Sequence, residues 1–87
     1  MIVVIVALES ELASQPLPAE AKLIHSGVGK VNAALAASEA IGRFRPRLVV
    51  NYGTAGAVHP GAHGLLHVGR VIQRDMDAEP LAPRGTT

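Results

Sequence analysis

Cysteine is absent from the 87 residues of the chain, and aromatic side chains are scarce, with one Phe, one Tyr and no Trp. Without cysteine, a disulfide scaffold and a thiolate metal site are both excluded. Hydrophobic residues make up 48% of the chain and charged residues 17%, which is typical of a globular protein rather than a disordered one. The apolar content is mainly Val, Leu, Ile and Ala, and this mixture suits buried parallel strands covered by Ala-rich helices.

Runs of basic residues and long apolar runs are also missing. The formal net charge is +1, and the one basic cluster, Arg43, Arg45 and Arg47, has no aromatic ladder beside it, so nucleic-acid binding is not expected. The longest apolar run covers residues 1–8, far below the roughly 20 residues that a membrane helix needs. Acidic residues follow it at once and no basic flank precedes it, unlike a signal peptide. We therefore expect a cytoplasmic protein with no membrane partner.

Hydrophobic patterning predicts alternating strands and helices. Residues 2–6 are five consecutive β-branched residues, which resist a helix and favour a strand buried on both faces. The remaining pattern predicts a short helix within 7–14, strands over 21–25 and 47–52, a helix over 31–44, and a fourth strand around 69–72. The apolar positions Val31, Leu35, Ala36 and Ile41 support the longer helix. A strand–helix–strand unit of this length implies a right-handed crossover and a mainly parallel sheet, and therefore an α/β fold.

Three loops follow the carboxyl ends of the first three predicted strands, where ligands bind in open α/β sheets. These loops cover residues 7–11, 26–30 and 53–56. If the strands are parallel neighbours, the loops converge and bring a carboxylate, two glycine turns and a hydroxyl to one crevice. Each loop alone has a plainer interpretation. The 26–30 loop is neither a Rossmann fingerprint nor a Walker A loop and by itself predicts only a tight turn with φ > 0. Glu11 alone is equally typical of a surface carboxylate.

Metal-ligating residue types are present but poorly arranged. His59, His63 and His67 are spaced by four residues, and a proline and two glycines interrupt the stretch. A helix that would align the imidazoles is therefore not expected, and a solvated loop is favoured over a metal site, which also needs a supporting second shell. Asp75 and Asp77 lie in polar sequence and are more typical of solvated carboxylates. We expect neither a metal nor another cofactor.

Order and spacing of the loop motifs are more informative than any one of them. The chain reads Val-Ala-Leu-Glu-Ser-Glu over 6–11, Ser-Gly-Val-Gly-Lys-Val-Asn-Ala-Ala over 26–34 and Val-Val-Asn-Tyr-Gly-Thr-Ala-Gly-Ala over 49–57. It resembles the nucleoside phosphorylase and nucleosidase superfamily, and most closely the methylthioadenosine/S-adenosylhomocysteine nucleosidases. The segment over 68–77 is similar to a later strand and loop of that family. The resemblance implies a three-layer α/β/α fold with a mostly parallel central sheet.

The same resemblance implies a reaction and roles for site residues. The reaction is hydrolysis of the N-glycosidic bond of an adenine (thio)nucleoside, such as methylthioadenosine or S-adenosylhomocysteine, with release of adenine and without a cofactor. Glu11 would polarise the attacking water, since a carboxylate near the anomeric carbon both activates water and stabilises oxocarbenium-like charge. Thr54 would lie near the ribose and this water, and Val28 would line the pocket for the 5′-alkylthio group. The implied substrate-binding residues are Ala7, Val28, Thr54, Ala55 and Gly56.

Two alternatives stay open. Phosphorylases of this superfamily carry arginines near the early glycine loop, and no arginine precedes Arg43 here, so a hydrolase is preferred to a purine nucleoside phosphorylase. The ribose clamp and the general acid of the family lie in its C-terminal half. Residues 1–87 are therefore expected to be the N-terminal portion of a single, incomplete domain, and a truncated, non-catalytic nucleoside-binding remnant is the second alternative. Family members are commonly homodimers, so a homodimer is also implied.

Overall fold

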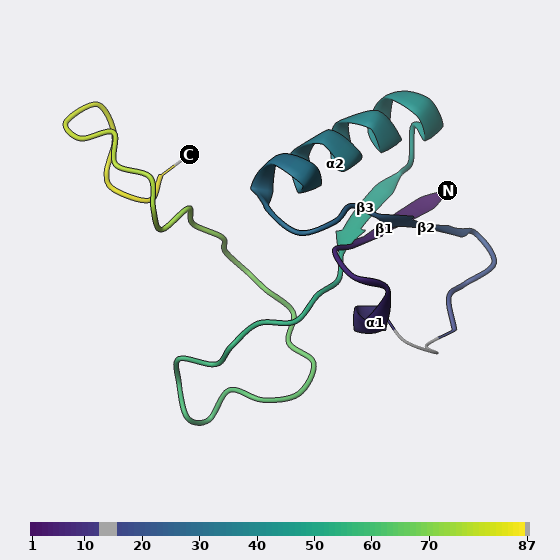
Figure 1. The fold of residues 1–87 in the computed structure, drawn as a ribbon, viewed down its shortest axis with the longest axis horizontal. Helices are drawn as coiled ribbons and strands as arrows, with labels where there is room; N and C mark the ends of the chain where they lie inside the picture. Colours follow the sequence, from purple (N-terminus) through teal and green to yellow (C-terminus); the bar gives the residue numbers. More distant parts are fainter. Residues whose placement is uncertain (13–15, 87) are drawn as a thin grey trace. The chain divides into compact units, whose positions relative to one another are not determined.

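The computed structural model describes residues 1–12 and 16–86. Along the chain, the order of elements is β1 (Ile2–Val6), α1 (Glu9–Leu12), β2 (Ala21–His25), α2 (Lys30–Phe44) and β3 (Leu48–Asn51) (Figure 1). All of them belong to the first of two compact units, Met1–Gly56 and Ala57–Thr87. The short helix predicted within 7–14 corresponds to α1, and residues 13 and 14 of that prediction lie outside the described residues.

The three strands form one parallel sheet in the order β2-β1-β3, with β1 in the centre. Ile5 of β1 pairs with Ile24 of β2 on one side and with Asn51 of β3 on the other. The predictions of strands over 2–6 and 21–25 are confirmed to the residue, and the third strand is one residue shorter at each end than predicted. Because the strands are parallel, their carboxyl ends lie at the same edge of the sheet.

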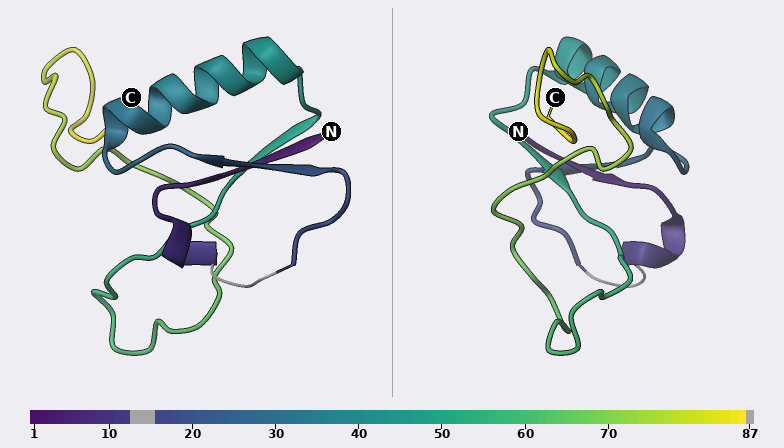
Figure 2. Two further views of the ribbon diagram at one scale, coloured as in Figure 1. Left: turned by 45° about the vertical axis from the view of Figure 1, so that its right-hand side comes forward. Right: turned by 90° about the vertical axis from the view of Figure 1, so that its left-hand side faces the viewer.

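The core lies on both faces of β1, since successive side chains of a strand point to opposite sides of the sheet. On one face Val3 and Ile5 pack against Ala40 of α2. On the other face Val4 and Val6 pack against Leu12 of α1. Figure 2 shows the sheet with α2 on one side and α1 on the other. The α/β fold class and its three-layer arrangement are therefore confirmed.

Two alanines and Phe44, rather than the larger aliphatic residues, attach α2 to the sheet. Ala37, Ala40 and Phe44 form the packed face, which follows the three- and four-residue spacing of a helix. The larger aliphatic side chains stay largely exposed, with exposed fractions of 74% for Val31, 64% for Leu35 and 52% for Ile41. The large apolar residues that indicated the helix are thus not the residues through which it packs against the sheet. Alanine lets the helix axis approach the sheet closely, and a bulkier face would hold it away.

The fourth strand, predicted around 69–72, does not form. Described residues 57–86 contain turns and irregular backbone without a strand, and Val68, Val71 and Ile72 are 64%, 81% and 60% exposed. A strand is stable only where a neighbouring strand takes up its backbone hydrogen bonds, and none lies alongside within this unit. The backbone instead closes on itself, because the N–H of Gly85 donates to the Met76 carbonyl at 2.8 Å and the Gly85 carbonyl accepts from the Gln73 N–H at 3.0 Å.

No helix within the described ranges combines the length and the apolar character needed to cross a membrane.

Close packing of α2 is testable by enlarging one alanine. Ala40 is 1% exposed, and Ala40→Leu is expected to destabilise the fold by about 1–3 kcal/mol through overpacking. Ala34 lies on the same helix and is exposed, so Ala34→Leu is the matched control and should change stability by less than about 0.5 kcal/mol. Urea unfolding of both variants measures the difference. Equal stabilities would show that α2 does not pack through Ala40.

Candidate active site

The loops that follow β1 and β3 meet beyond the carboxyl edge of the sheet. Tyr52 and Ser26 continue the sheet for one more step, because their N–H groups donate to the carbonyls of Ile5 at 3.0 Å and Val6 at 2.9 Å. Past this point β1 leads into α1, which carries Glu11, and β3 leads into the loop that carries Thr54. Parallel pairing thus brings together two residues that are 43 positions apart in the sequence.

Glu11 is held by four hydrogen-bond donors. Its Oε1 atom accepts from the backbone N–H groups of Ala7 at 3.0 Å and Leu8 at 2.9 Å. Its Oε2 atom accepts from the backbone N–H of Thr54 at 2.8 Å and from the Thr54 hydroxyl at 3.1 Å. A carboxylate offers about four acceptor positions in all. The four donors therefore occupy every acceptor position that the Glu11 side chain has.

These donors favour the ionised form of Glu11. They hold the pKa of its carboxyl below the ordinary value, the Thr54 backbone N–H contributing most and the Leu8 N–H next, against a smaller opposing effect of desolvation. The carboxylate is accordingly retained to lower pH than for a free glutamate side chain. An ionised carboxylate in fixed orientation is the form that accepts a proton from water.

Gly53 makes the contact between Glu11 and Thr54 possible. A Cβ atom built at this position would lie 3.1 Å from Oε2 of Glu11, tighter than nine in ten real Cβ contacts. A side chain at this position would require the Glu11 carboxylate to move by a few tenths of an ångström. The close approach of the two loops brings Thr54 into hydrogen-bond contact with Glu11. Gly53 was not among the predicted site residues, although its place directly before Thr54 was a usable signal.

Between β2 and α2 lies the glycine turn that carries Val28. Gly27 and Gly29 have φ angles of 79° and 106°, so the turn predicted for this segment is confirmed, and a side chain at either position would strain the backbone. The side chain of Val28 is 66% exposed. Its carbonyl accepts a hydrogen bond from Nδ2 of Asn32 at 2.8 Å. The turn thus presents an apolar side chain to solvent at the carboxyl end of β2.

Of the other predicted site residues, one contacts Glu11 through its backbone. Ala7 donates its N–H to Glu11. Ala55 and Gly56 follow Thr54 in the same loop and are exposed. The structure brings Glu11, Thr54 and Ala7 into direct contact, and it leaves Val28, Ala55 and Gly56 in the exposed loops at that edge of the sheet.

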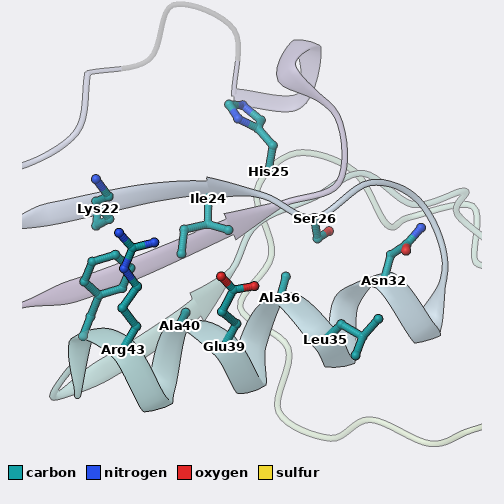
Figure 3. A pocket seen from close by; sticks show the side chains of 11 residues that line it. Lys22, Ile24, His25, Ser26, Asn32, Leu35, Ala36, Glu39, Ala40 and Arg43 are labelled. Atoms are coloured by element: carbon teal, nitrogen blue, oxygen red, sulfur yellow. The ribbon is translucent and has the colours of Figure 1, made fainter.

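A groove of about 450 Å³ runs between the edge strand β2 and helix α2 (Figure 3). Its polar lining residues are Lys22, His25, Ser26, Asn32, Glu39 and Arg43. Lys22 Nζ and Arg43 Cζ lie 5.5 and 5.3 Å from the centre of the Phe44 ring, within cation–π range. Glu11 and Thr54 do not line this groove, so the chemistry of the candidate site lies elsewhere.

Metal binding has no support from the described residues. Within 1–12 and 16–86, no three His, Asp or Glu side chains lie close enough to hold a metal ion. His59 and His63 lie in a stretch of turns and irregular backbone, so the helical alignment that their spacing offers is not formed.

Comparison with known proteins identifies the family of the chain. The sequence profile of the phosphorylase superfamily matches residues 19–83, which include β2, the glycine turn, α2 and the Thr54 loop. The chain belongs to the phosphorylase superfamily. No solved structure gives a significant match.

Within this superfamily the chain is similar to bacterial proteins called 5′-methylthioadenosine/S-adenosylhomocysteine nucleosidase. That of Bacillus licheniformis is 43% identical over 53 residues, which make up 61% of this chain and 21% of the relative. That of Geobacillus thermodenitrificans is 42% identical over 60 residues, or 67% and 25%. That of Listeria monocytogenes serovar 1/2a is 43% identical over 65 residues, or 75% and 24%. The predicted resemblance is confirmed, and the chain spans about a quarter of the length of these relatives.

The role of Gly53 in this superfamily member is testable without a substrate. Gly53→Ala is expected to separate Glu11 from Thr54 and so to raise the pKa of the Glu11 carboxyl toward its ordinary value, since the largest lowering contribution is the Thr54 N–H. Gly56→Ala is the matched control, because nothing lies within 4 Å of a Cβ at that position. An NMR titration of the Glu11 side-chain carbonyl measures both. An unchanged pKa in Gly53→Ala would contradict the close approach.

Proposed function

We propose that the protein hydrolyses the N-glycosidic bond of adenine (thio)nucleosides, such as methylthioadenosine and S-adenosylhomocysteine, and releases adenine. The observation that carries this proposal is an ionised Glu11 held between the loops of β1 and β3 by Thr54 and two further backbone donors. The names of its relatives support the choice of nucleoside. Residues 1–87 would then be the N-terminal portion of a single nucleosidase domain.

In the proposed reaction Glu11 is the general base. The attacking water gives a proton to the Glu11 carboxylate as its oxygen bonds to the anomeric carbon of the ribose. The bond from that carbon to N9 of adenine breaks, and its electron pair leaves with the base, which is then protonated. The negative charge of Glu11 also stabilises the positive charge that develops on the ribose ring before the water bond is complete.

One hydrogen bond must open before Glu11 can act. All four acceptor positions are filled in this structure, and a water that gives up its proton needs one of them. Three donors are backbone N–H groups fixed by β1, α1 and the β3 loop. The fourth, the Thr54 hydroxyl, makes the longest bond of the set at 3.1 Å and turns by rotation about its side-chain bond. In the proposal it swings from Glu11 to the water or the ribose.

The remaining site residues surround this pair. Val28 supplies an apolar wall for the 5′-alkylthio group, and its 66% exposed side chain is available for that contact. The N–H groups of Ala55 and Gly56 are engaged by no other described residue and can meet ribose hydroxyls. Ala7 lines the site beside Glu11. The proposal also includes a cytoplasmic homodimer, which the exposed apolar side chains of α2 support.

Replacement of Glu11 tests the base. Glu11→Gln keeps the size of the side chain and removes the charge, so adenine release from methylthioadenosine should fall by about 10²–10⁴-fold in the protein as its native gene encodes it. Glu9→Gln, two residues away on α1 and exposed, should leave turnover within about twofold. Undiminished turnover in Glu11→Gln would sink the assignment. A requirement for inorganic phosphate would instead favour the phosphorylase.

The Thr54 hydroxyl is tested by the pH dependence of kcat/KM. The two Thr54 donors lower the pKa of Glu11, so its carboxyl group stays ionised to lower pH. Activity should therefore be lost only as the pH falls through that lowered pKa. Thr54→Val keeps the shape and the N–H but removes the hydroxyl donor, and its acidic limb should move to higher pH. Thr54→Ser keeps the donor and should retain the wild-type limb. Identical acidic limbs in all three proteins would contradict the role of the hydroxyl.

A further inference from the structure

The turn that carries Val28 has little to stiffen it locally. Glycines flank Val28 on both sides, each in the left-handed region of φ, and glycine retains more backbone freedom than any other residue. The Val28 side chain is mostly exposed and packs against no core residue. The glycine at the start of α2, Gly29, provides no side-chain cap for the helix. Hydrogen bonds from outside the two glycines must therefore hold the position of Val28.

Two side chains supply those bonds, one at each end of the turn. Ser26 holds the first half, since its N–H donates to the Val6 carbonyl at 2.9 Å and its hydroxyl donates to the Gly27 carbonyl at 2.8 Å. Asn32 holds the second half, since its Nδ2 donates to the Val28 carbonyl at 2.8 Å. Figure 3 shows Asn32 on the first turn of α2, with its side chain directed back toward the turn.

Asn32 touches the turn at two successive residues. Besides donating to Val28, its Nδ2 atom lies 3.4 Å from the position that a Cβ atom on Gly27 would take. The amide thus packs over Gly27 while it binds the Val28 carbonyl. Since α2 is fixed to the sheet through Ala40 and its neighbours, Asn32 links the exposed Val28 to the rigid part of the fold.

We infer that Asn32 is a positioning residue for the 5′-substituent of the substrate: its amide tethers Val28 so that the wall of the 5′ pocket is preformed. This inference rests on the proposed function, because it assumes that Val28 meets the 5′-alkylthio group. It concerns binding of that group and leaves the bond cleavage to Glu11. Asn32 therefore affects discrimination between nucleosides that differ at the 5′ position.

The test compares Asn32→Asp with wild type in the protein as its native gene encodes it. The aspartate keeps the size of the side chain and removes the hydrogen-bond donor. Its negative charge is favourable at the helix N-terminus, so the bond to Val28 is lost while α2 stays folded. The KM for methylthioadenosine should rise about 3- to 10-fold with kcat unchanged, less than the 10–200-fold value of a whole methylene contact. The KM for adenosine, which lacks the alkylthio group, should not change. Asn32→Ala should follow Asn32→Asp, and Val31→Ala, a change at an exposed neighbour, is the control.

A second readout separates this inference from the proposed function. In Asn32→Asp the backbone amide order parameter of Val28 should fall from about 0.85 to below about 0.6, since the tether is lost. If wild type releases no adenine, the proposed function is wrong, and the order parameter alone then decides whether Asn32 tethers Val28. An unchanged order parameter overturns the inference. Equal rises in KM for both nucleosides, or a fall in kcat alone, overturn its link to the 5′ group.

Discussion

Burial of β1 on both faces is the constraint on which the rest of the structure depends. Five β-branched residues form the central strand, with Val3 and Ile5 on one face and Val4 and Val6 on the other. A strand buried in this way needs a neighbour on each side and a helical layer on each face. The parallel pairing that satisfies it places the ends of β1, β2 and β3 at one edge, and that edge is where the polar residues of the chain converge.

The candidate site then depends on how closely two of these loops approach each other. Glu11 approaches the β3 loop closely at Gly53, where a Cβ atom would lie 3.1 Å from its carboxylate. Once there, it meets two donors of Thr54 and two backbone donors that precede α1. The same four bonds orient the carboxylate and keep it ionised. Geometry and protonation state therefore have one cause, which explains how a short, exposed helix presents a base in a defined position.

The sequence predicted what depends on the chain's local pattern. Strands 2–6 and 21–25 and the helix beginning near residue 30 follow from β-branched runs, alanine content and glycine punctuation, and the structure agrees with them. It did not predict which face of α2 packs, because close approach favours alanine over the larger side chains that the hydrophobic pattern emphasises. The strand expected at 69–72 does not form, for a related reason. A strand needs a neighbouring strand to pair with, and the local sequence pattern does not indicate whether one is present. The roles of Glu11 and Thr54 came from resemblance, while the contacts of Gly53 and Asn32 became visible only in the structure.

A carboxylate with every acceptor position filled is well oriented but cannot accept a proton from water. In the proposed mechanism, one of its hydrogen bonds therefore has to break first. Three of its donors are backbone N–H groups. Their movement would disturb β1 or the ends of the sheet, so breaking one of these bonds is costly in free energy. The bond from the Thr54 hydroxyl breaks by rotation of that side chain alone. In the proposed mechanism, a threonine thus combines two tasks that alanine and glycine cannot perform together: its N–H orients Glu11, and its hydroxyl occupies the carboxylate until a water or a ribose hydroxyl replaces Glu11 as its partner. The proposed roles place opposite requirements on Val28 and Glu11, because a wall for an apolar group has to stay in place while a base has to exchange a hydrogen-bond partner. Asn32 and Thr54 are the side chains that contact these two residues.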